Sequence, residues 1–335
     1  MAATLSDGST AAEVPSASSS HDAAGDDDLL DEAYLRFHAT SPEYQTTLAN
    51  HGPMAVDALL RLGAAPLVSD WVSRYVLRLE PVPAGRWPIT ESEWREPLGD
   101  PSRLGDWLRF FARALADEPW QEVVHRWWPR LLPGGAAAAT HGIIRTGHAV
   151  RALRVRVTAP RTAELAHALA YWSARWQPLP TPSHPLAPGE EQYAVGVLPH
   201  ALTTLTDNAV SSYVASAHGN PVGWVHAATA PRAAALVLPS IPHEQWAGTY
   251  ATARVLAAAA PADYHPVHPP TDERNGQDDS SADLAPDAVV AEAVSHHQDE
   301  HVLKFVEVAL ESHRRGNRLA LPAARRAITL IERPR

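Results

Sequence analysis

A single lysine and an excess of histidine are the features of this sequence that could carry chemistry. The 335 residues include 18 His, and among the 28 Lys and Arg residues only Lys304 is a lysine. Such a composition indicates a coding bias toward arginine, so the retained lysine is either a chance surface residue or has a role that arginine cannot fill. Lysine can lose its proton and act as a nucleophile or base, or be carboxylated by CO₂.

Lys304 belongs to a helical stripe near the C-terminus. Positions three or four residues apart share one face of a helix, and here they are Val290, Val294, His297, His301, Lys304 and Val308. Because valines bracket the polar members, we interpret the stripe as a buried face that contains two imidazoles and an amine. The alternative is a solvated stripe at the same spacing, which consists of His301, Lys304, Glu307 and Glu311.

Further histidines occur in helical or apolar surroundings. His141 and His148 are one heptad apart on an alanine-rich segment. His51 begins another helical segment, and His226 stands before Pro231 in an apolar stretch. A hydrogen-bonded core histidine is the more common explanation for any one of them. Several neutral imidazoles with one anionic oxygen donor, such as a carboxylated lysine, would instead suit Fe(II), Mn or Zn, and the absence of Cys favours the harder metals.

The elements that must position these residues are helices. The predicted class is all-α, with a single large multi-helix domain and a metal or substrate pocket between core helices. The helical segments are predicted near residues 29–37, 50–63, 70–79, 104–115, 120–128, 136–155, 164–176, 194–217, 231–238, 243–260, 287–315 and 322–331. The alternation that is typical of strands is not sustained anywhere in the sequence.

The acidic residues are concentrated in two segments of the chain, one at the N-terminus and one within the helical domain. Residues 1–28 are predicted to be a disordered acidic tail, 29–331 the helical domain, and 265–287 a mobile loop within it. The net charge of −10 arises largely from these acidic segments, so it does not indicate a nucleic-acid partner. No run approaches the roughly 18 apolar residues that span a bilayer. We therefore expect a cytoplasmic protein without a membrane partner.

Several common motifs are missing from the sequence. Neither a dinucleotide-binding glycine motif nor a phosphate loop is present, and the serine-hydrolase and zinc-protease signatures are absent too. No cofactor-binding residues of these kinds are therefore assigned. The aromatic and basic residues around Trp127 and Trp128 could stack on nucleic-acid bases, but core packing is the favoured interpretation.

Five blocks of the sequence resemble the questin oxidase-like family. The similarity spans about residues 30–315, and its most specific part is 140–153. The blocks are Asn50–Met54 (NHGPM), Trp127–Gly134 (WWPRLLPG), Ala139–Leu153 (ATHGIIRTGHAVRAL), His226–Pro231 (HAATAP) and Asp299–Glu307 (DEHVLKFVE).

The resemblance implies an oxidoreductase of secondary metabolism that uses O₂ to oxidise or open the ring of a small anthraquinone-type aromatic polyketide. It also implies non-heme iron held by four His and a carboxylated Lys. Carried over by motif, Lys304 is the carboxylated ligand, and His51, His226 and His301 are ligands. The fourth ligand is either His141 or His148. His297 fits the helical stripe but is less firmly placed in the motif, and no catalytic acid or base is implied.

Two other functions are compatible with the same residues. The first is an NADPH-dependent Baeyer–Villiger-type oxidase, or a cofactor-free oxidase, in which the histidines are acids and bases. NADPH is also the possible electron donor for the iron enzyme. The second is a non-catalytic helical protein that binds an aromatic ligand, with the polar core residues only forming hydrogen bonds. The sequence does not indicate an oligomeric state.

Overall fold

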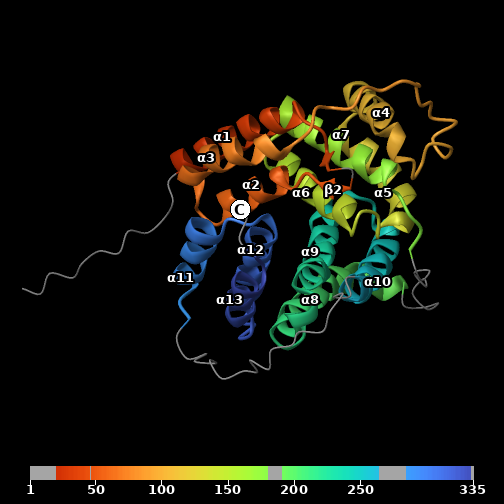
Figure 1. The fold of residues 1–335 in the computed structure, drawn as a ribbon. Coiled ribbons are helices and arrows are strands. Elements are labelled where there is room, and N and C mark those ends of the chain that lie inside the picture. The colour runs from red at the N-terminus through yellow and green to blue at the C-terminus, as the bar shows by residue number, and fades with distance from the viewer. Residues whose placement is uncertain (1–19, 46, 180–190, 264–283, 333–335) are drawn as a thin grey trace, which may run out of the picture.

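The computed structural model describes residues 20–45, 47–179, 191–263 and 284–332, and these are almost entirely helical (Figure 1). The prediction of an all-α class is confirmed. The longer helices are α1 (Ser20–His38), α2 (Gly52–Arg61), α3 (Ala65–Tyr75), α4 (Leu104–Asp117), α5 (Trp120–Leu131), α6 (His141–Val155), α7 (Ala159–Ala174), α8 (Glu191–Ser216), α9 (Pro221–Val237), α10 (Trp246–Asp263), α12 (Glu300–Arg314) and α13 (Ala320–Leu330). A small antiparallel hairpin joins β1 (Glu43–Tyr44) to β2 (Leu48–Ala49).

The helix that was predicted over 287–315 is interrupted. The structure has α11 (Pro286–Ala291), then a π-helix (Glu292–His297), and then α12. The break lies at Gln298, whose φ of 59° is left-handed and cannot continue a right-handed helix. Asp299 then starts α12 as its N-cap, because its carboxylate accepts hydrogen bonds from the backbone N–H groups of His301 and Val302.

Other boundaries also differ from the prediction: the helices predicted from residues 70, 136 and 164 begin at Ala65, His141 and Ala159. The helix predicted over 231–238 is the second half of α9, which begins at Pro221 and is capped by Asn220. His226 therefore lies within a helix, and Pro231 does not end it. The predicted disordered tail over 1–28 is wrong for residues 20–28, which are helical, whereas residues 1–19 lie outside the described residues.

Ion pairs explain why the acidic end of the predicted tail is ordered. Asp27 and Asp31 of α1 lie 2.5 and 2.7 Å from the guanidinium group of Arg161, which is fully buried. Arg156 contacts Asp28 and Asp31. These pairs offset the repulsion between the acids and attach α1 to α7. Most of the predicted mobile loop, residues 264–283, lies outside the described residues.

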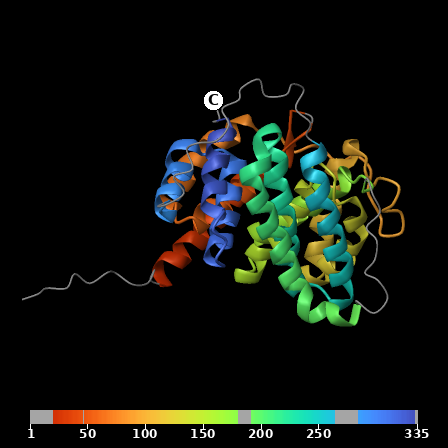
Figure 2. The same cartoon turned by 90° about the horizontal axis from the view of Figure 1, so that it is seen from below.

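Helices α2, α6, α9 and α12 pack together at the centre of the domain. Helix α9 contacts α6, α8, α10 and α12, and α2 contacts both α6 and α12. In two perpendicular views α8, α9 and α10 run side by side (Figures 1 and 2). The chain thus brings α2, α6, α9 and α12 together although they are far apart in the sequence. None of the helices in the described ranges is long and apolar enough to cross a membrane.

The tryptophans of the Trp-Trp-Pro block are core residues. Trp127 and Trp128 are fully buried in the apolar cluster around α4–α7. The ring of Trp127 packs edge-on against Trp107, and the Nε1–H of Trp128 donates a hydrogen bond to Thr249 Oγ1 at 2.9 Å. The interpretation of this block as core packing is confirmed.

Helices α6 and α9 approach each other closely at Gly147. A Cβ atom at this position would lie 2.8 Å from the Cα and the carbonyl oxygen of Ala233 in α9. Backbone atoms cannot move aside as a flexible side chain can. Glycine at 147 and alanine at 233 therefore permit the distance between these helices.

We predict that Gly147→Ala destabilises the domain by about 1–3 kcal/mol, because the added methyl group forces α6 and α9 apart. Gly248→Ala is the matched control, since this helical glycine has open space around its Cβ position, and its stability should change by no more than about 1 kcal/mol. Urea unfolding measures both. Equal stability of the two variants would contradict the close approach.

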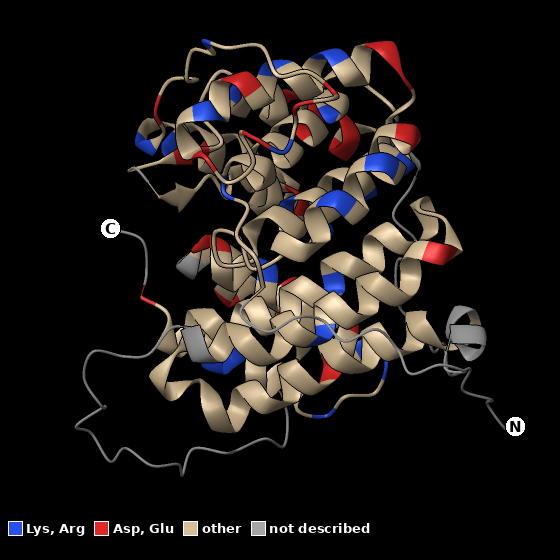
Figure 3. Cartoon of the chain, turned by 90° about the vertical axis from the view of Figure 1, so that its right-hand side faces the viewer, with Lys and Arg blue, Asp and Glu red and all other residues tan. Residues whose placement is uncertain are grey.

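Charged residues of both signs are interspersed along the described chain (Figure 3). One buried pair of them joins α6 to α7. Arg145 donates two hydrogen bonds to Glu164, at 2.6 and 2.9 Å, and both side chains are almost completely buried. Burial opposes ionisation of Glu164, but the Arg145 guanidinium outweighs it and lowers the pKa of Glu164 to about 2. This pair contributes stability above the ordinary pKa of 4.5 and loses it as the pH falls toward 2.

Glu164→Gln should therefore cost less stability in acid than at neutral pH. We expect the loss in the free energy of unfolding to be about 2 kcal/mol smaller at pH 3 than at pH 7, because the wild-type carboxylate is being protonated in the unfolded state. Urea unfolding of both proteins at the two pH values measures this difference. The same loss at both pH values would show that Glu164 has an unshifted pKa.

Candidate metal site

Four histidines and Lys304 come together where the four central helices meet. His51 immediately precedes α2, His141 is the first residue of α6, and His226 lies within α9. His301 and Lys304 lie in the first turns of α12. Because each helix supplies its histidine at or near the same junction, residues up to 250 positions apart in the sequence share one small volume.

The imidazole rings are within contact of one another. The Nε2 atoms of His51 and His141 are 2.6 Å apart. The ring centroid of His301 is 4.6 Å from that of His51, and the centroid of His226 is 4.6 Å from that of His141. Nitrogen atoms of His51, His141 and His301 all lie within 4.8 Å of one another, which is close enough to share one ion.

Burial keeps three of these imidazoles neutral. The pKa values of His51, His141 and His226 are well below the ordinary value, chiefly because burial disfavours the charged ring. The positive charge of Lys304 adds to this effect on His51 and His141. Neutral imidazole has a lone pair to donate, so this is the protonation state that a metal requires.

Lys304 is fully buried beside these rings, which confirms the interpretation of the C-terminal stripe as a buried face. Its Nζ atom forms no hydrogen bond with any residue that the structure describes. Burial lowers the pKa of Lys304 to about 8, and the nearby Glu300 and Asp299 carboxylates oppose this shift. An amine in this environment is easily deprotonated, because burial without a hydrogen bond disfavours its charged form.

Polar groups outside the cluster orient two of the rings. The Nδ1–H of His141 donates to the Ala138 carbonyl at 2.5 Å, so the lone pair of neutral His141 is at Nε2, which faces His51. His301 Nδ1 is 3.4 Å from Asp299 Oδ1, the carboxylate that caps α12. Such contacts fix the tautomer of a ligating imidazole and raise its basicity.

The turn before His141 has an unusual backbone. Ala138, Ala139 and Thr140 have φ values of 46°, 54° and 70°, a left-handed region that non-glycine residues rarely adopt. Consecutive left-handed residues store strain, which is often found at functional sites. This turn places the Ala138 carbonyl against the His141 ring. The alanine-rich sequence contains no signal for this turn. For the second orienting group, Asp299, a signal exists, because an aspartate two residues before His301 can be an N-cap.

The structure places His148 outside the cluster. Its Nδ1 is 2.8 Å from Asp57 Oδ2, and Arg151 donates to the same carboxylate from Nε at 3.0 Å. Arg151 also donates to Glu307 of α12. All four side chains are buried, and the Arg151 guanidinium overcomes the effect of burial and holds the pKa of Asp57 well below its usual range. His297 lies in the π-helix, and its side chain is outside the described residues.

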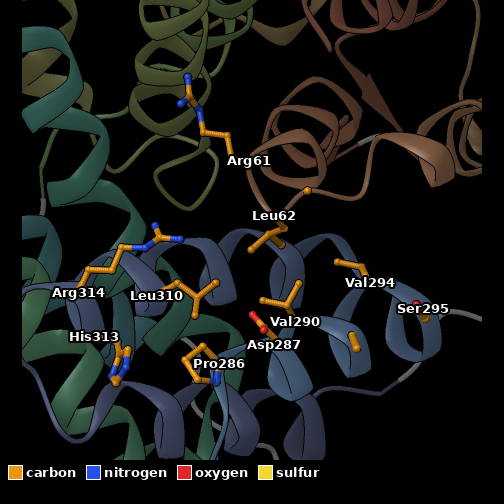
Figure 4. Close-up of a pocket in the computed structure, with 12 residues that line it drawn as sticks. Arg61, Leu62, Pro286, Asp287, Val290, Val294, Ser295, Leu310, His313 and Arg314 are labelled. Carbon is orange, nitrogen blue, oxygen red and sulfur yellow. The ribbon is translucent and has the colours of Figure 1, made fainter. Parts of the chain in front are cut away.

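A cavity of about 380 Å³ lies at the other end of α2 and α12 (Figure 4). It is bounded by the C-terminal turn of α2, by α11 and the π-helix, and by the last turns of α12. Its lining includes Arg61, Leu62, Val290, Val294, Leu310 and Arg314. Because His51 and His301 lie at the beginnings of α2 and α12, this cavity is separate from the histidine cluster. No tryptophan is among the described residues that line this cavity.

The donor set fits a borderline divalent metal. Imidazoles are ligands for Fe(II), Mn(II) and Zn(II), and a carboxylated Lys304 would add the anionic oxygen ligand that favours the harder ions of this series. Among the described residues the buried Lys304 amine has no hydrogen-bond partner, and an added ligand group would explain this observation.

Comparison with models of known protein families found a match in this chain. The model of the questin oxidase-like family matches residues 48–159, about a third of the chain. The matched segment contains His51, His141 and His148, whereas His226, His301 and Lys304 lie beyond it. No curated protein matches the chain. Over residues 48–159 the chain is thus similar to the questin oxidase-like family, as three of the five sequence blocks indicated.

Proposed function

We propose that this protein is a non-heme iron oxidoreductase that uses O₂ to oxidise or open the ring of an anthraquinone-type aromatic polyketide. The family match supports the oxidoreductase class and the substrate type. The observation that carries the metal is the convergence of imidazoles from four helices on one buried amine. The proposed ligands are His51, His141, His226, His301 and carboxylated Lys304.

Carboxylation of Lys304 resolves an electrostatic conflict in this site. A protonated lysine beside four imidazoles would repel a divalent cation. When the neutral Nζ attacks CO₂, an N–C bond forms and a proton leaves, so the side chain becomes an anionic carbamate. The carbamate oxygen can bind the ion, and its negative charge offsets part of the charge of the metal. Arginine cannot undergo this reaction, which accounts for the retained lysine.

The bound iron would supply the activation of O₂ beside the substrate, with NADPH as the proposed electron donor. The protein holds the site in place. The Ala138 carbonyl and the Asp299 carboxylate orient two rings, while Arg151 links the three helices that carry His51, His141 and His301. Burial of the cluster limits the access of water, which would allow side reactions such as hydrolysis.

We predict that Lys304→Ala and Lys304→Arg both lose bound iron, because neither side chain can form a carbamate. The measurement is metal per chain by inductively coupled plasma mass spectrometry after anaerobic loading with Fe(II) and bicarbonate. Lys304→Met is the control for packing, since it keeps the volume of the side chain, and it should fold like the wild type and also lack iron. Full iron content in Lys304→Arg would refute the carbamate.

The two histidines of α6 should differ in their effect on the metal. His141→Ala should weaken iron binding at least tenfold, because loss of an orienting group alone costs roughly 10–100-fold and His141 is a proposed ligand. His148→Gln should keep its iron, because His148 contacts Asp57 instead of the cluster. Iron titration of both variants, with circular dichroism as a check of folding, decides the assignment. Loss of iron in His148→Gln alone would reverse it.

Turnover and binding measurements on the same proteins distinguish the alternative functions. If the protein still oxidises a hydroxyanthraquinone after a chelator has removed all metal, it is a cofactor-free or NADPH-dependent oxidase. Stoichiometric binding of the compound without turnover or bound metal would indicate a binding protein. The proposal requires that turnover depend on iron and be lost in Lys304→Ala.

A further inference from the structure

The histidine cluster is not equally buried on all sides. His226 and Lys304 are completely inaccessible to solvent, and His51 and His141 are nearly so. The side chains of His301 and Asp299 each retain 15% of their exposure. Solvent, and therefore a ligand, is closest to the cluster on the side where α12 begins.

Arg78 lies beside the first residue of α12, Glu300. It belongs to a 3₁₀ turn (Val76–Arg78) that follows α3, and its side chain is 38% exposed. Its Nη2 is 3.5 Å from Glu300 Oε2, while the other oxygen of Glu300 is 3.6 Å from Nδ1 of His51. One carboxylate thus stands between an exposed cation and a ring of the cluster.

The contact between Arg78 and Glu300 leaves most of the guanidinium available. A guanidinium has five N–H donors, and 3.5 Å is at the long end for a hydrogen bond. Among the described residues Glu300 is the one carboxylate that pairs with Arg78. The planar group also lies 4.2 Å above the ring of Tyr75, which holds it in a fixed orientation.

The surroundings of Arg78 are suited to a flat aromatic molecule. Tyr44 interacts with Tyr75, whose hydroxyl oxygen accepts a hydrogen bond from the backbone N–H of His51 at 2.8 Å. Leu48 is paired with Tyr44 across the hairpin and is exposed, as is Leu77 beside Arg78. Exposed apolar side chains next to a cation can bind a ring that carries an anionic substituent.

We propose that Arg78 is the subsite for an anionic oxygen, a phenolate or carboxylate, of an aromatic ligand that approaches the histidine cluster from this side. In the free protein Glu300 occupies part of this subsite, and the ligand anion takes its place or shares the guanidinium with it. The inference rests on the proposed function for the role of the cluster, but the subsite can be tested without any turnover.

The test compares pairs of probes that differ only in charge. Affinities of the iron-loaded protein are measured for a hydroxyanthraquinone with an ionised hydroxyl and for its O-methyl ether, and also for benzoate and benzamide. Loss of a charge-assisted hydrogen bond corresponds to roughly a tenfold to hundredfold loss in affinity. We expect Arg78→Ala to lose this amount for the anionic probes and to bind the neutral probes as the wild type does.

Arg74→Ala is the matched control. Arg74 lies one helical turn before Arg78 and is also exposed, but it donates to the neutral side-chain amide of Gln298 at 2.6 Å. This variant should keep the preference for anions, and Arg78→Lys should restore part of it. The iron content of every variant is measured first, so that a change in the metal site is not mistaken for a change in ligand binding.

Each outcome separates the subsite from the proposed function. Selective loss of anion affinity in Arg78→Ala supports the subsite, and an undiminished preference for anions in this variant overturns it. If benzoate binding depends on Arg78 but no anthraquinone is bound or oxidised, the subsite stands and the proposed substrate class fails. If the wild type oxidises anthraquinones without preferring the anionic probe, the function stands and the subsite fails.

Discussion

Arg151 forms the interaction on which the geometry of the candidate site depends. Its guanidinium bonds to Asp57 of α2 and to Glu307 of α12, while its own helix is α6. These helices carry His51, His301 and His141 a few turns away. Removing one partner of such a buried network leaves an unpaired charge, which costs about 3–5 kcal/mol. The network therefore specifies one arrangement of three helices, and the positions of three imidazoles follow from it.

The same burial that stabilises the helices sets the chemistry of the cluster. Three imidazoles are held neutral because a buried ring is costly to protonate. Among the described residues the Lys304 amine has no hydrogen-bond partner. Ion pairs satisfy the charged groups that surround the cluster, such as Asp57 and Glu164. The groups of the cluster can therefore bind a metal or a ligand, whereas the ion-paired groups stabilise the fold.

Local patterns predicted much of this arrangement because they report on burial. The spacing of Val294, His301, Lys304 and Val308 indicated a buried helical face, and the structure buries Lys304 completely. The same spacing did not reveal the break at Gln298, because a left-handed residue leaves no mark on the periodicity of its neighbours. Pro231 suggested a helix boundary, but surrounding helices accommodate it within α9.

The sequence by itself determined the all-α class, favoured a buried face for the lysine, and indicated a small set of histidines with suitable surroundings. It could not separate His141 from His148, since two residues one heptad apart share a helix face. Only the tertiary structure decided this placement: His141 meets His51 at the junction of the helices, while His148 meets Asp57 one heptad further along. Periodicity reports which side of a helix is buried. The neighbours at each position along the helix axis are set by the packing of other helices.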